Sequence, residues 1–215
     1  MPKIQVDNRE IEAPENTTVL QACLDNGIYI PNLCYLEGME APSASCRMCF
    51  VEVEGERQPV TSCTALVKEN MVVKTDTETV RDLQRTALRL LLSVHDVDCK
   101  NCHANKNCAL QNIAKFLKVG LKPKRLGRYL KEIEIDESHP FLIHYPNRCV
   151  LCGKCVHICK EKHDQPILTF AKRGFDTIIS FLGVEDSFML DCSACHACID
   201  ICPVGALALG NNQHR

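Results

Sequence analysis

The sequence predicts an α+β protein assembled from small cysteine-rich modules. Short β-branched runs alternate with stretches of helical periodicity, a pattern typical of small mixed domains. The chain has 215 residues and 16 cysteines, and every cysteine except Cys23 falls into one of four groups with short internal spacings. Cysteines this dense predict metal or redox chemistry rather than disulfides if the protein is in a reducing compartment.

Such a compartment is what the rest of the sequence predicts. The first 20 residues are charged and broken by prolines, so we expect neither a secretory signal nor a membrane span, and no stretch reaches 18 uninterrupted apolar residues. We therefore expect a cytoplasmic protein. The formal net charge of −2, which thiolate-bound iron clusters would make more negative, argues against nucleic acid as a partner.

Residues 1–79 predict a β-grasp domain. The runs IQV, FVEVE and MVVKT predict strands. Thr17 or Thr18 is expected to cap a helix that ends at Gly27. Cys23 pairs with Val19 at helical spacing on this helix, which indicates a core side chain rather than a ligand.

The other four cysteines of this domain follow the spacing C-x11-C-x2-C-x13-C and are Cys34, Cys46, Cys49 and Cys63. Plant-type [2Fe-2S] ferredoxins use C-x4-C-x2-C with a distant fourth cysteine. The inner pair agrees with that pattern, and the first interval is longer. Small residues at 41–45 would let backbone N–H groups approach the sulfides. We predict a [2Fe-2S] cluster here, with zinc as the alternative.

The last two cysteine groups share the spacing C-x2-C-x2-C-x3-C. In bacterial ferredoxins the first three thiolates of such a run bind one cubane and the fourth ligates the other cluster. This crossed pairing predicts two [4Fe-4S] clusters, one on Cys149, Cys152, Cys155 and Cys202, the other on Cys192, Cys195, Cys198 and Cys159. Pro203 fits the ferredoxin pattern, whereas Lys160 at the matching position departs from it. Zinc, commonly bound by two separated C-x2-C pairs, is the alternative.

A short hairpin is predicted between these two groups. The stretch FDTIISFLGVEDSFML has β-branched and aromatic residues on both sides of Gly183, which is a turn signal.

The remaining group has three cysteines, Cys99, Cys102 and Cys108, four residues after His95. The run VRDLQRTALRLLLSV predicts a helix over 80–94, so His95 would emerge at the helix end, where it can turn toward Cys99. A cubane with three thiolates still needs a ligand on its fourth iron, and imidazole is suitable. Spacing alone leaves open whether His95 is that ligand, because a lone histidine is more often an ordinary surface or core residue.

These motifs together resemble the iron–sulfur portion shared by three groups of proteins. They are the large iron–sulfur subunit of respiratory complex I, the N-terminal region of iron-only hydrogenases, and small subunits of NAD(P)-linked hydrogenases, formate dehydrogenases and electron-bifurcating complexes. The resemblance rests on IPNLCY, CRMC, HDVDCKNC and DICPVGAL and covers roughly residues 1–210. It implies a [4Fe-4S] cluster on His95, Cys99, Cys102 and Cys108. One [2Fe-2S] and three [4Fe-4S] clusters are then expected.

The resemblance implies four segments along the chain: the β-grasp domain at 1–79, a helical cluster domain at 80–120, a basic linker at 121–138 and a two-cluster ferredoxin-like domain at 139–215. It also implies an electron-transfer subunit of a multisubunit NAD(P)H-linked oxidoreductase. The expected partners are an NAD(P)H-binding FMN flavoprotein subunit and a further catalytic subunit or a ferredoxin.

No catalytic residues are expected in the chain itself. It lacks both G-x-G-x-x-G after a strand and G-x-x-x-x-G-K-[ST], so nothing would hold a dinucleotide or flavin phosphate in the usual way. Two alternatives remain, a free-standing polyferredoxin and a zinc-binding interaction protein. The run 115–131, with seven Lys or Arg and no acid, indicates either a docking segment or a solvated linker.

Overall fold

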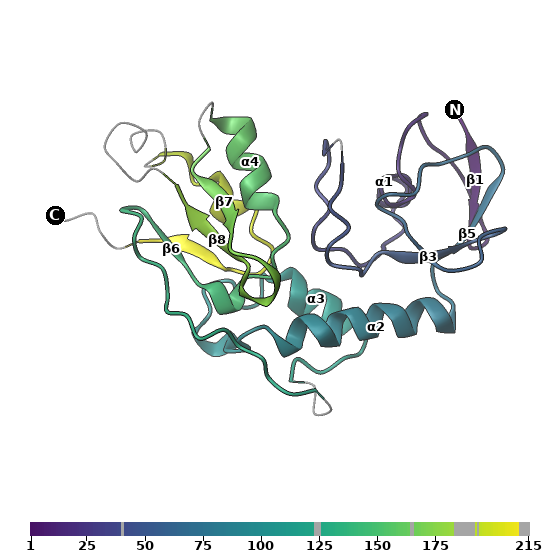
Figure 1. Cartoon of the computed structure of the whole chain (residues 1–215). Coiled ribbons are helices and arrows are strands. Elements are labelled where there is room, and N and C mark those ends of the chain that lie inside the picture. Colours follow the sequence, from purple (N-terminus) through teal and green to yellow (C-terminus); the bar gives the residue numbers. More distant parts are fainter. Residues whose placement is uncertain (40, 123–125, 164–165, 183–191, 193, 211–215) are drawn as a thin grey trace. The chain divides into compact units, whose positions relative to one another are not determined.

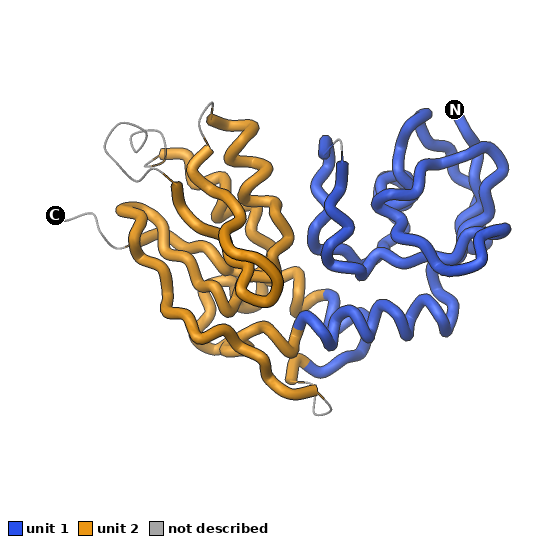
Figure 2. The backbone as a smooth tube through the Cα atoms, viewed as in Figure 1, with its two compact units in different colours: residues 1–91, 113–120 blue, residues 92–112, 121–215 orange. Residues whose placement is uncertain are grey.

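The fold was taken from a computed structural model (Figure 1), which describes residues 1–39, 41–122, 126–163, 166–182, 192 and 194–210. The chain forms two compact units (Figure 2). The N-terminal unit contains residues 1–91 and 113–120, and the C-terminal unit contains residues 92–112 and 121–215. Two of the three borders, at 91/92 and 112/113, fall inside the segment 80–120, and the third falls at its end. The four-segment division expected from the motifs stays a prediction.

A five-stranded mixed sheet forms the frame of the N-terminal unit, with strand order β2-β1-β5-β3-β4. The first two strands form an antiparallel hairpin, and β1 is parallel to β5, the last strand of the domain in sequence. This is the topology of a β-grasp domain, as predicted. The strands are β1 (Lys3–Val6), β2 (Arg9–Glu12), β3 (Phe50–Val53), β4 (Val60–Thr61) and β5 (Met71–Lys74).

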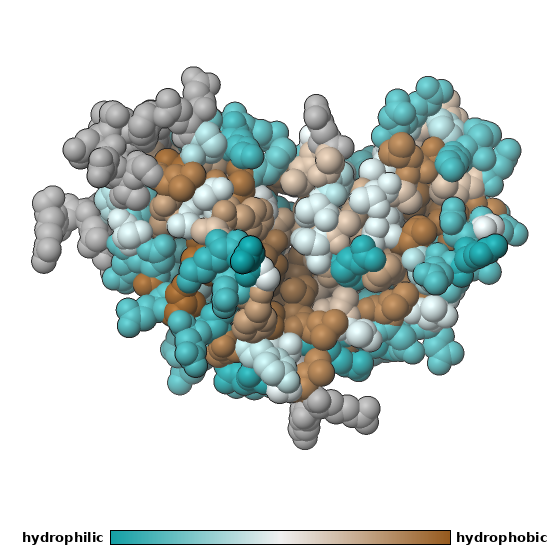
Figure 3. All heavy atoms as spheres, viewed as in Figure 1, coloured by the Kyte–Doolittle hydropathy of each residue, from teal (hydrophilic) through white to brown (hydrophobic). Residues whose placement is uncertain are grey.

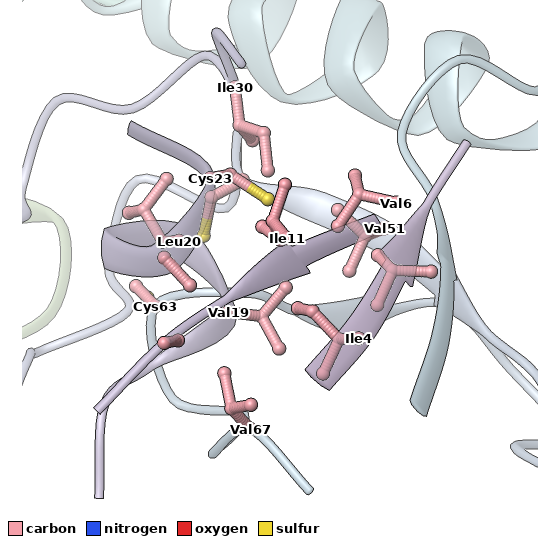
Figure 4. Close-up of a cluster of buried hydrophobic side chains, with 14 residues drawn as sticks. Ile4, Val6, Ile11, Val19, Leu20, Cys23, Ile30, Val51, Cys63 and Val67 are labelled. Atoms are coloured by element: carbon pink, nitrogen blue, oxygen red, sulfur yellow. The ribbon is translucent and has the colours of Figure 1, made fainter. Parts of the chain in front are cut away.

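Helix α1 (Val19–Asp25) closes the core, because its buried side chains belong to the same apolar cluster as those of the strands. Thr18 caps it, because its side chain accepts a hydrogen bond from the backbone N–H of Gln21 at 3.2 Å. The helix ends two residues before Gly27, which adopts a left-handed φ of 71°. Cys23 is fully buried among the apolar side chains of this core (Figure 4), which confirms its predicted structural role.

Two further helices belong to the segment after the β-grasp domain, α2 (Glu78–Ser93) and α3 (Ala109–Phe116). Helix α2 is fixed to the sheet through the buried side chain of Gln84, which donates to the carbonyl oxygen of Phe50 at 3.2 Å. The guanidinium of Arg81 lies 4.5 Å from the centre of the Phe116 ring, and Arg85 donates to the carbonyl oxygen of Leu117.

Among its described residues, the C-terminal unit has two short antiparallel sheets and the helices α4 and α6. The strand β6 pairs with β9 and β7 pairs with β8. Helices α4 and α6 each begin within one of the C-terminal cysteine motifs. In chain order the elements are η1 (Cys99–Asn101), β6 (Leu142–His144), η2 (Pro146–Arg148), α4 (Lys154–Lys162), β7 (Leu168–Ala171), η3 (Gly174–Asp176), β8 (Ile178–Phe181), α6 (Ala197–Asp200) and β9 (Leu207–Leu209).

The described part of this unit contains a hairpin that was not predicted from the sequence. The strand Ile178–Phe181 pairs with Leu168–Ala171, and the connection between them is residues 172–177. Lys172 and Gly174 both adopt left-handed φ there. The predicted turn at Gly183 and the strand after it fall outside the described residues.

The basic segment is held to its own unit at several points. The backbone N–H of Tyr129 donates to the carbonyl oxygen of Ser93 at 2.8 Å, and Arg128 forms an ion pair with Asp96 at 2.9 Å. The backbone groups of Lys131 bond in both directions with the side chain of Asn147. These contacts argue against a freely solvated linker over residues 128–131.

Hydrophilic side chains cover much of the visible surface of each unit, with apolar residues scattered among them (Figure 3). Within the described part of the chain, no helix has both the length and the apolar content to cross a membrane.

Candidate metal centres

The four outlying cysteines of the β-grasp domain lie together in the structure. All four are at most 5% exposed. The thiols of Cys34 and Cys46 share a hydrogen bond, as do those of Cys49 and Cys63, and the two pairs interact electrostatically. Cys63 is positioned by Ser62, whose backbone N–H and side-chain hydroxyl both donate to the carbonyl oxygen of Cys49.

The thiol pairs lower the proton affinity of one member each. The hydrogen bond from Cys46 lowers the pKa of Cys34 to about 5, and the bond from Cys63 lowers the pKa of Cys49 to about 7. The pKa of Cys46 and of Cys63 is raised in return, mainly by the same bonds. A metal centre here would release the retained protons, because the thiolate is the binding form.

The loop of small residues contributes in a way that the sequence did not indicate. We expected backbone N–H groups to approach the sulfides, and the structure adds hydroxyl donors, because Ser43 and Ser45 both hydrogen-bond to Cys34. Ala44 and Arg47, on either side of Cys46, adopt left-handed φ of 49° and 53°. A non-glycine residue in this region is strained, and such strain is common in loops that wrap a ligand.

The C-terminal motifs also contain residues with left-handed φ between their cysteines. Leu151 and Gly153 are left-handed within the first motif, and His196 is left-handed within the second. Each of these residues lies between two cysteines spaced two apart, so the chain reverses there and turns both sulfurs toward one point.

Each set of four cysteines expected from crossed pairing lines one cavity. The first cavity is lined by Cys149, Cys152, Cys155 and Cys202, and the second by Cys159, Cys192, Cys195 and Cys198. The fourth cysteine of each motif thus lies with the first three of the other motif, which is the arrangement that the spacing predicts.

Sulfur atoms in these cavities are buried, and two of those in the first cavity accept hydrogen bonds from backbone N–H groups. Burial raises the pKa of Cys149 and of Cys198 to about 12, so their thiols stay protonated unless a cation compensates the charge. The backbone N–H of Leu151 donates to Cys149 Sγ at 3.4 Å, and that of Ala206 donates to Cys202 Sγ at 3.2 Å. Donors of this kind stabilise a thiolate–iron centre.

His95 lies two residues beyond the end of α2 and is 9% exposed. Its Nδ1 is buried and has no hydrogen-bond partner among the described residues, whereas the backbone of Arg148 hydrogen-bonds the ring. A metal-binding histidine commonly has this arrangement, in which one nitrogen is oriented by a backbone group and the other faces the metal. Burial lowers the pKa of His95, which favours the neutral form that binds metals.

The three cysteines after His95 also lie near one another. Cys108 is buried and interacts electrostatically with Cys102 and Cys99. The donor set of this segment therefore fits a cubane, with three thiols and one partnerless imidazole nitrogen.

This segment is bonded to the C-terminal cysteine motif. The backbone N–H of Ala109 donates to the carbonyl oxygen of Pro203 at 2.9 Å. Gly205, at a left-handed φ of 66°, approaches so closely that a Cβ there would stand 2.6 Å from the Cβ of Ala104 and 3.3 Å from Cys102 Sγ. The loop that contains Cys102 and the loop that follows Cys202 are thus in direct contact.

None of the described residues forms a group of three or more His, Cys, Asp or Glu side chains arranged to hold a single metal ion. The cavities are compatible with a cluster instead, since each thiolate of a cluster binds its own iron atom rather than one shared ion.

Three family models match successive parts of the chain. A 2Fe-2S iron-sulfur cluster binding domain matches residues 2–78, the NADH-ubiquinone oxidoreductase-G iron-sulfur binding region matches residues 84–121, and the ferredoxin-like domain of NADH-quinone oxidoreductase subunit 3 matches residues 139–208. The chain therefore contains all three kinds of iron–sulfur domain that these models describe. The resemblance inferred from the motifs is confirmed, as is the presence of both 2Fe-2S and 4Fe-4S binding domains.

Individual relatives match nearly the whole chain. The alpha subunit of the NADPH-Fe(3+) oxidoreductase of Geobacter sulfurreducens is 34% identical over 207 residues, which is 96% of this chain and 24% of that protein. The HndD subunit of the NADP-reducing hydrogenase of Solidesulfovibrio fructosivorans is 35% identical over 215 residues, 96% of this chain and 36% of that protein. The chain thus spans about a quarter to a third of the length of these relatives.

A solved structure agrees with the fold over a larger share of its own length. A chain in the crystal structure of an NAD+-reducing [NiFe]-hydrogenase in the H2-reduced state is 29% identical, with a TM-score of 0.83 over 98% of this chain and 88% of that one. This match confirms the predicted fold class of ferredoxin domains with mixed helix and strand content.

Two further histidines lie at the cavities, and the sequence did not single them out. His144 lines the first cavity, and His163 lines the second. Neither belongs to a cysteine motif, so spacing gave no signal for them.

Proposed function

We propose that this chain is an electron-transfer subunit of a multisubunit NAD(P)H-linked oxidoreductase. It would relay single electrons between an FMN-containing flavoprotein subunit and another redox site or a ferredoxin. The relatives named as subunits of an NADPH-Fe(3+) oxidoreductase and of an NADP-reducing hydrogenase support this role.

The proposal includes four clusters. A [2Fe-2S] cluster would be held by Cys34, Cys46, Cys49 and Cys63, and three [4Fe-4S] clusters by His95 with Cys99, Cys102 and Cys108, by Cys149, Cys152, Cys155 and Cys202, and by Cys159, Cys192, Cys195 and Cys198. Each cluster would accept and release one electron at a time.

The observation that carries the proposal is the contact between successive sites in the C-terminal unit. Cys102 Sγ packs against Gly205, and the residue after Gly205 donates its N–H to Cys202 Sγ. A redox centre on Cys102 and one on Cys202 would therefore be separated by a few backbone atoms. A series of centres at short separation suits a fixed relay, whereas a diffusing carrier needs fewer.

The test is to recover the tagged chain from its native host and to follow reduction of its visible iron–sulfur absorption. We expect the purified chain alone to be bleached by dithionite but not by NADH or NADPH, and to retain no flavin after desalting. The chain recovered with its partners should be bleached by one of the two nucleotides. Recovery of the chain without any stoichiometric partner, together with rapid exchange of electrons with free ferredoxin-dependent enzymes, would support a free-standing polyferredoxin instead.

A further inference from the structure

His144 is a fully buried histidine at a cavity of the C-terminal unit. It lies at the end of β6, is 1% exposed, and neither ring nitrogen has a hydrogen-bond partner among the described residues. Its backbone is firmly held, because its N–H and carbonyl groups exchange two hydrogen bonds of 2.9 Å with Asp136. A buried polar group without a partner costs about 1–3 kcal/mol, so an unpaired imidazole here calls for a ligand.

The surroundings of His144 indicate which ligand would satisfy it. Its side chain lines the cavity that also contains the sulfurs of Cys149, Cys152, Cys155 and Cys202. Among the described residues that line this cavity, His144 has the single side chain with a nitrogen or oxygen atom; the others are cysteine, glycine or apolar. A sulfur-rich group in the cavity is therefore the acceptor within reach.

The second cavity has a histidine of its own. His163 follows helix α4, lines the cavity formed by Cys159, Cys192, Cys195 and Cys198, and places its Nε2 3.3 Å from Cys195 Sγ. Here the contact between imidazole nitrogen and sulfur is already formed. The two cavities thus have different donors, a fully buried imidazole in the first and a partly exposed one in the second.

We propose that His144 and His163 are positioning residues that each donate an N–H hydrogen bond to the sulfur of one ferredoxin-type cluster and raise its reduction potential. The inference rests on the two clusters of the proposed function. Four cysteines already serve the four irons of each cubane, so neither histidine is needed as a ligand. An imidazole has at least one N–H in either protonation state, so the donor is present at any pH near neutrality.

The direction of the effect follows from charge. A reduced cluster has one more negative charge than its oxidised form, so an N–H dipole aimed at its sulfur stabilises the reduced form more. Removal of the donor should lower the potential of that cluster alone. The effect is expected to be larger for His144, because its side chain is fully buried whereas that of His163 is partly exposed, so the interaction of His144 is less screened by water.

The test is an EPR-monitored redox titration of the full chain, reconstituted under anaerobic conditions. The two signals are first assigned as the one lost in Cys155→Ala and the one lost in Cys198→Ala. We expect His144→Leu to lower the midpoint potential of the Cys155-dependent signal by at least about 59 mV. For a one-electron centre this shift is a tenfold change in the ratio of oxidised to reduced cluster. His163→Leu should likewise lower the midpoint potential of the Cys198-dependent signal. Each variant should leave the midpoint potential of the other signal unchanged.

Two further variants separate a donor from a structural effect. His144→Gln keeps an N–H group and should recover part of the shift. His139→Asn is the matched control, because His139 is also buried, at 2% exposure, and lines neither cavity; asparagine can still accept the bonds that His139 Nδ1 receives from Phe141 and Leu142. Both potentials should be unchanged in this control.

The outcomes distinguish the donor role from the cluster assignment. Normal iron content with unchanged potentials in His144→Leu and His163→Leu would overturn the donor role and leave the clusters in place. Loss of a whole cluster in both His144→Leu and His144→Gln would show that His144 is a ligand, and this result would also overturn the donor role. Absence from the wild type of any signal that depends on Cys155 or Cys198 would instead overturn the cluster assignment itself, and the donor role with it.

Discussion

The backbone N–H of Ala109 donates to the carbonyl oxygen of Pro203 at 2.9 Å, which joins the residue after Cys108 to the residue after Cys202. Two cysteines that are far apart in sequence, and that belong to different proposed clusters, are therefore held through adjacent residues. Gly205 completes this junction, because its left-handed backbone lets the loop that contains Ala104 approach without a side chain between them.

Substitution of Gly205 by alanine should damage this junction. A left-handed alanine costs about 1–2 kcal/mol, and the clash at 2.6 Å with the Cβ of Ala104 should add about 1–3 kcal/mol of overpacking. Gly174→Ala is the control, because Gly174 has a similar φ of 59° and nothing within 4 Å of an added Cβ. In thermal denaturation, Gly205→Ala should lower Tm clearly more than Gly174→Ala; equal losses would show that the contact does not matter.

Cys23 and Cys63 offer a matched pair within one core. Both are buried and belong to the same apolar cluster (Figure 4), but only Cys63 shares a hydrogen bond with another cysteine thiol of the proposed set. Cys63→Ala should abolish the [2Fe-2S] signal. Cys23→Ala should retain it and cost about 1 kcal/mol of stability, as expected for removal of a single buried heavy atom. Burial raises the pKa of Cys23 to about 12, which agrees with a neutral core thiol. Loss of the signal in Cys23→Ala would contradict this division of roles.

Substitution of His95 should change the properties of one cluster alone, the one proposed on Cys99, Cys102 and Cys108. With imidazole in place of a thiolate, that cluster has one less negative charge, so its potential should be raised, as it is in histidine-ligated Rieske centres. His95→Cys should keep the cluster and lower its potential, and His95→Ala should give a labile cluster or a three-iron form. EPR-monitored titration reads both effects, and His103→Ala is the control from the same segment. Unchanged spectra and midpoints in both His95 variants would exclude His95 as a ligand.

The crossed pairing can be tested at its fourth cysteines. If Cys202 completes the cavity formed by Cys149, Cys152 and Cys155, then Cys202→Ala and Cys155→Ala should weaken the same EPR signal. Cys159→Ala should weaken the signal that depends on Cys198. The opposite grouping, in which Cys202 and Cys198 act on one signal, would exclude crossed pairing.

Much of this arrangement was accessible from sequence, because the relevant constraints are local. A threonine cap at 17 or 18, the core position of Cys23 and the crossed cavities were predicted from short spacings, and the structure places the cap at Thr18. The pairing of Ile178–Phe181 with Leu168–Ala171 was not predicted, because no turn signal was recognised around Lys172 and Gly174, where both residues adopt left-handed φ.

The positions of His144 and His163 at the cavities could not be predicted from the sequence either. His144 reaches the first cavity because β6 pairs with β9, the strand that follows Cys202, and this pairing spans more than sixty residues of sequence. His163 meets Cys195 across 32 residues. No short motif encodes such contacts, so they emerge only from the folded chain.

The most direct test of the whole account is a count of iron, acid-labile sulfide and zinc in the anaerobically reconstituted chain, combined with Mössbauer spectroscopy. One [2Fe-2S] and three [4Fe-4S] clusters predict about 14 iron atoms per chain, with the spectrum divided between the two cluster types in the ratio of one to six. Stoichiometric zinc with little iron or sulfide would contradict the account.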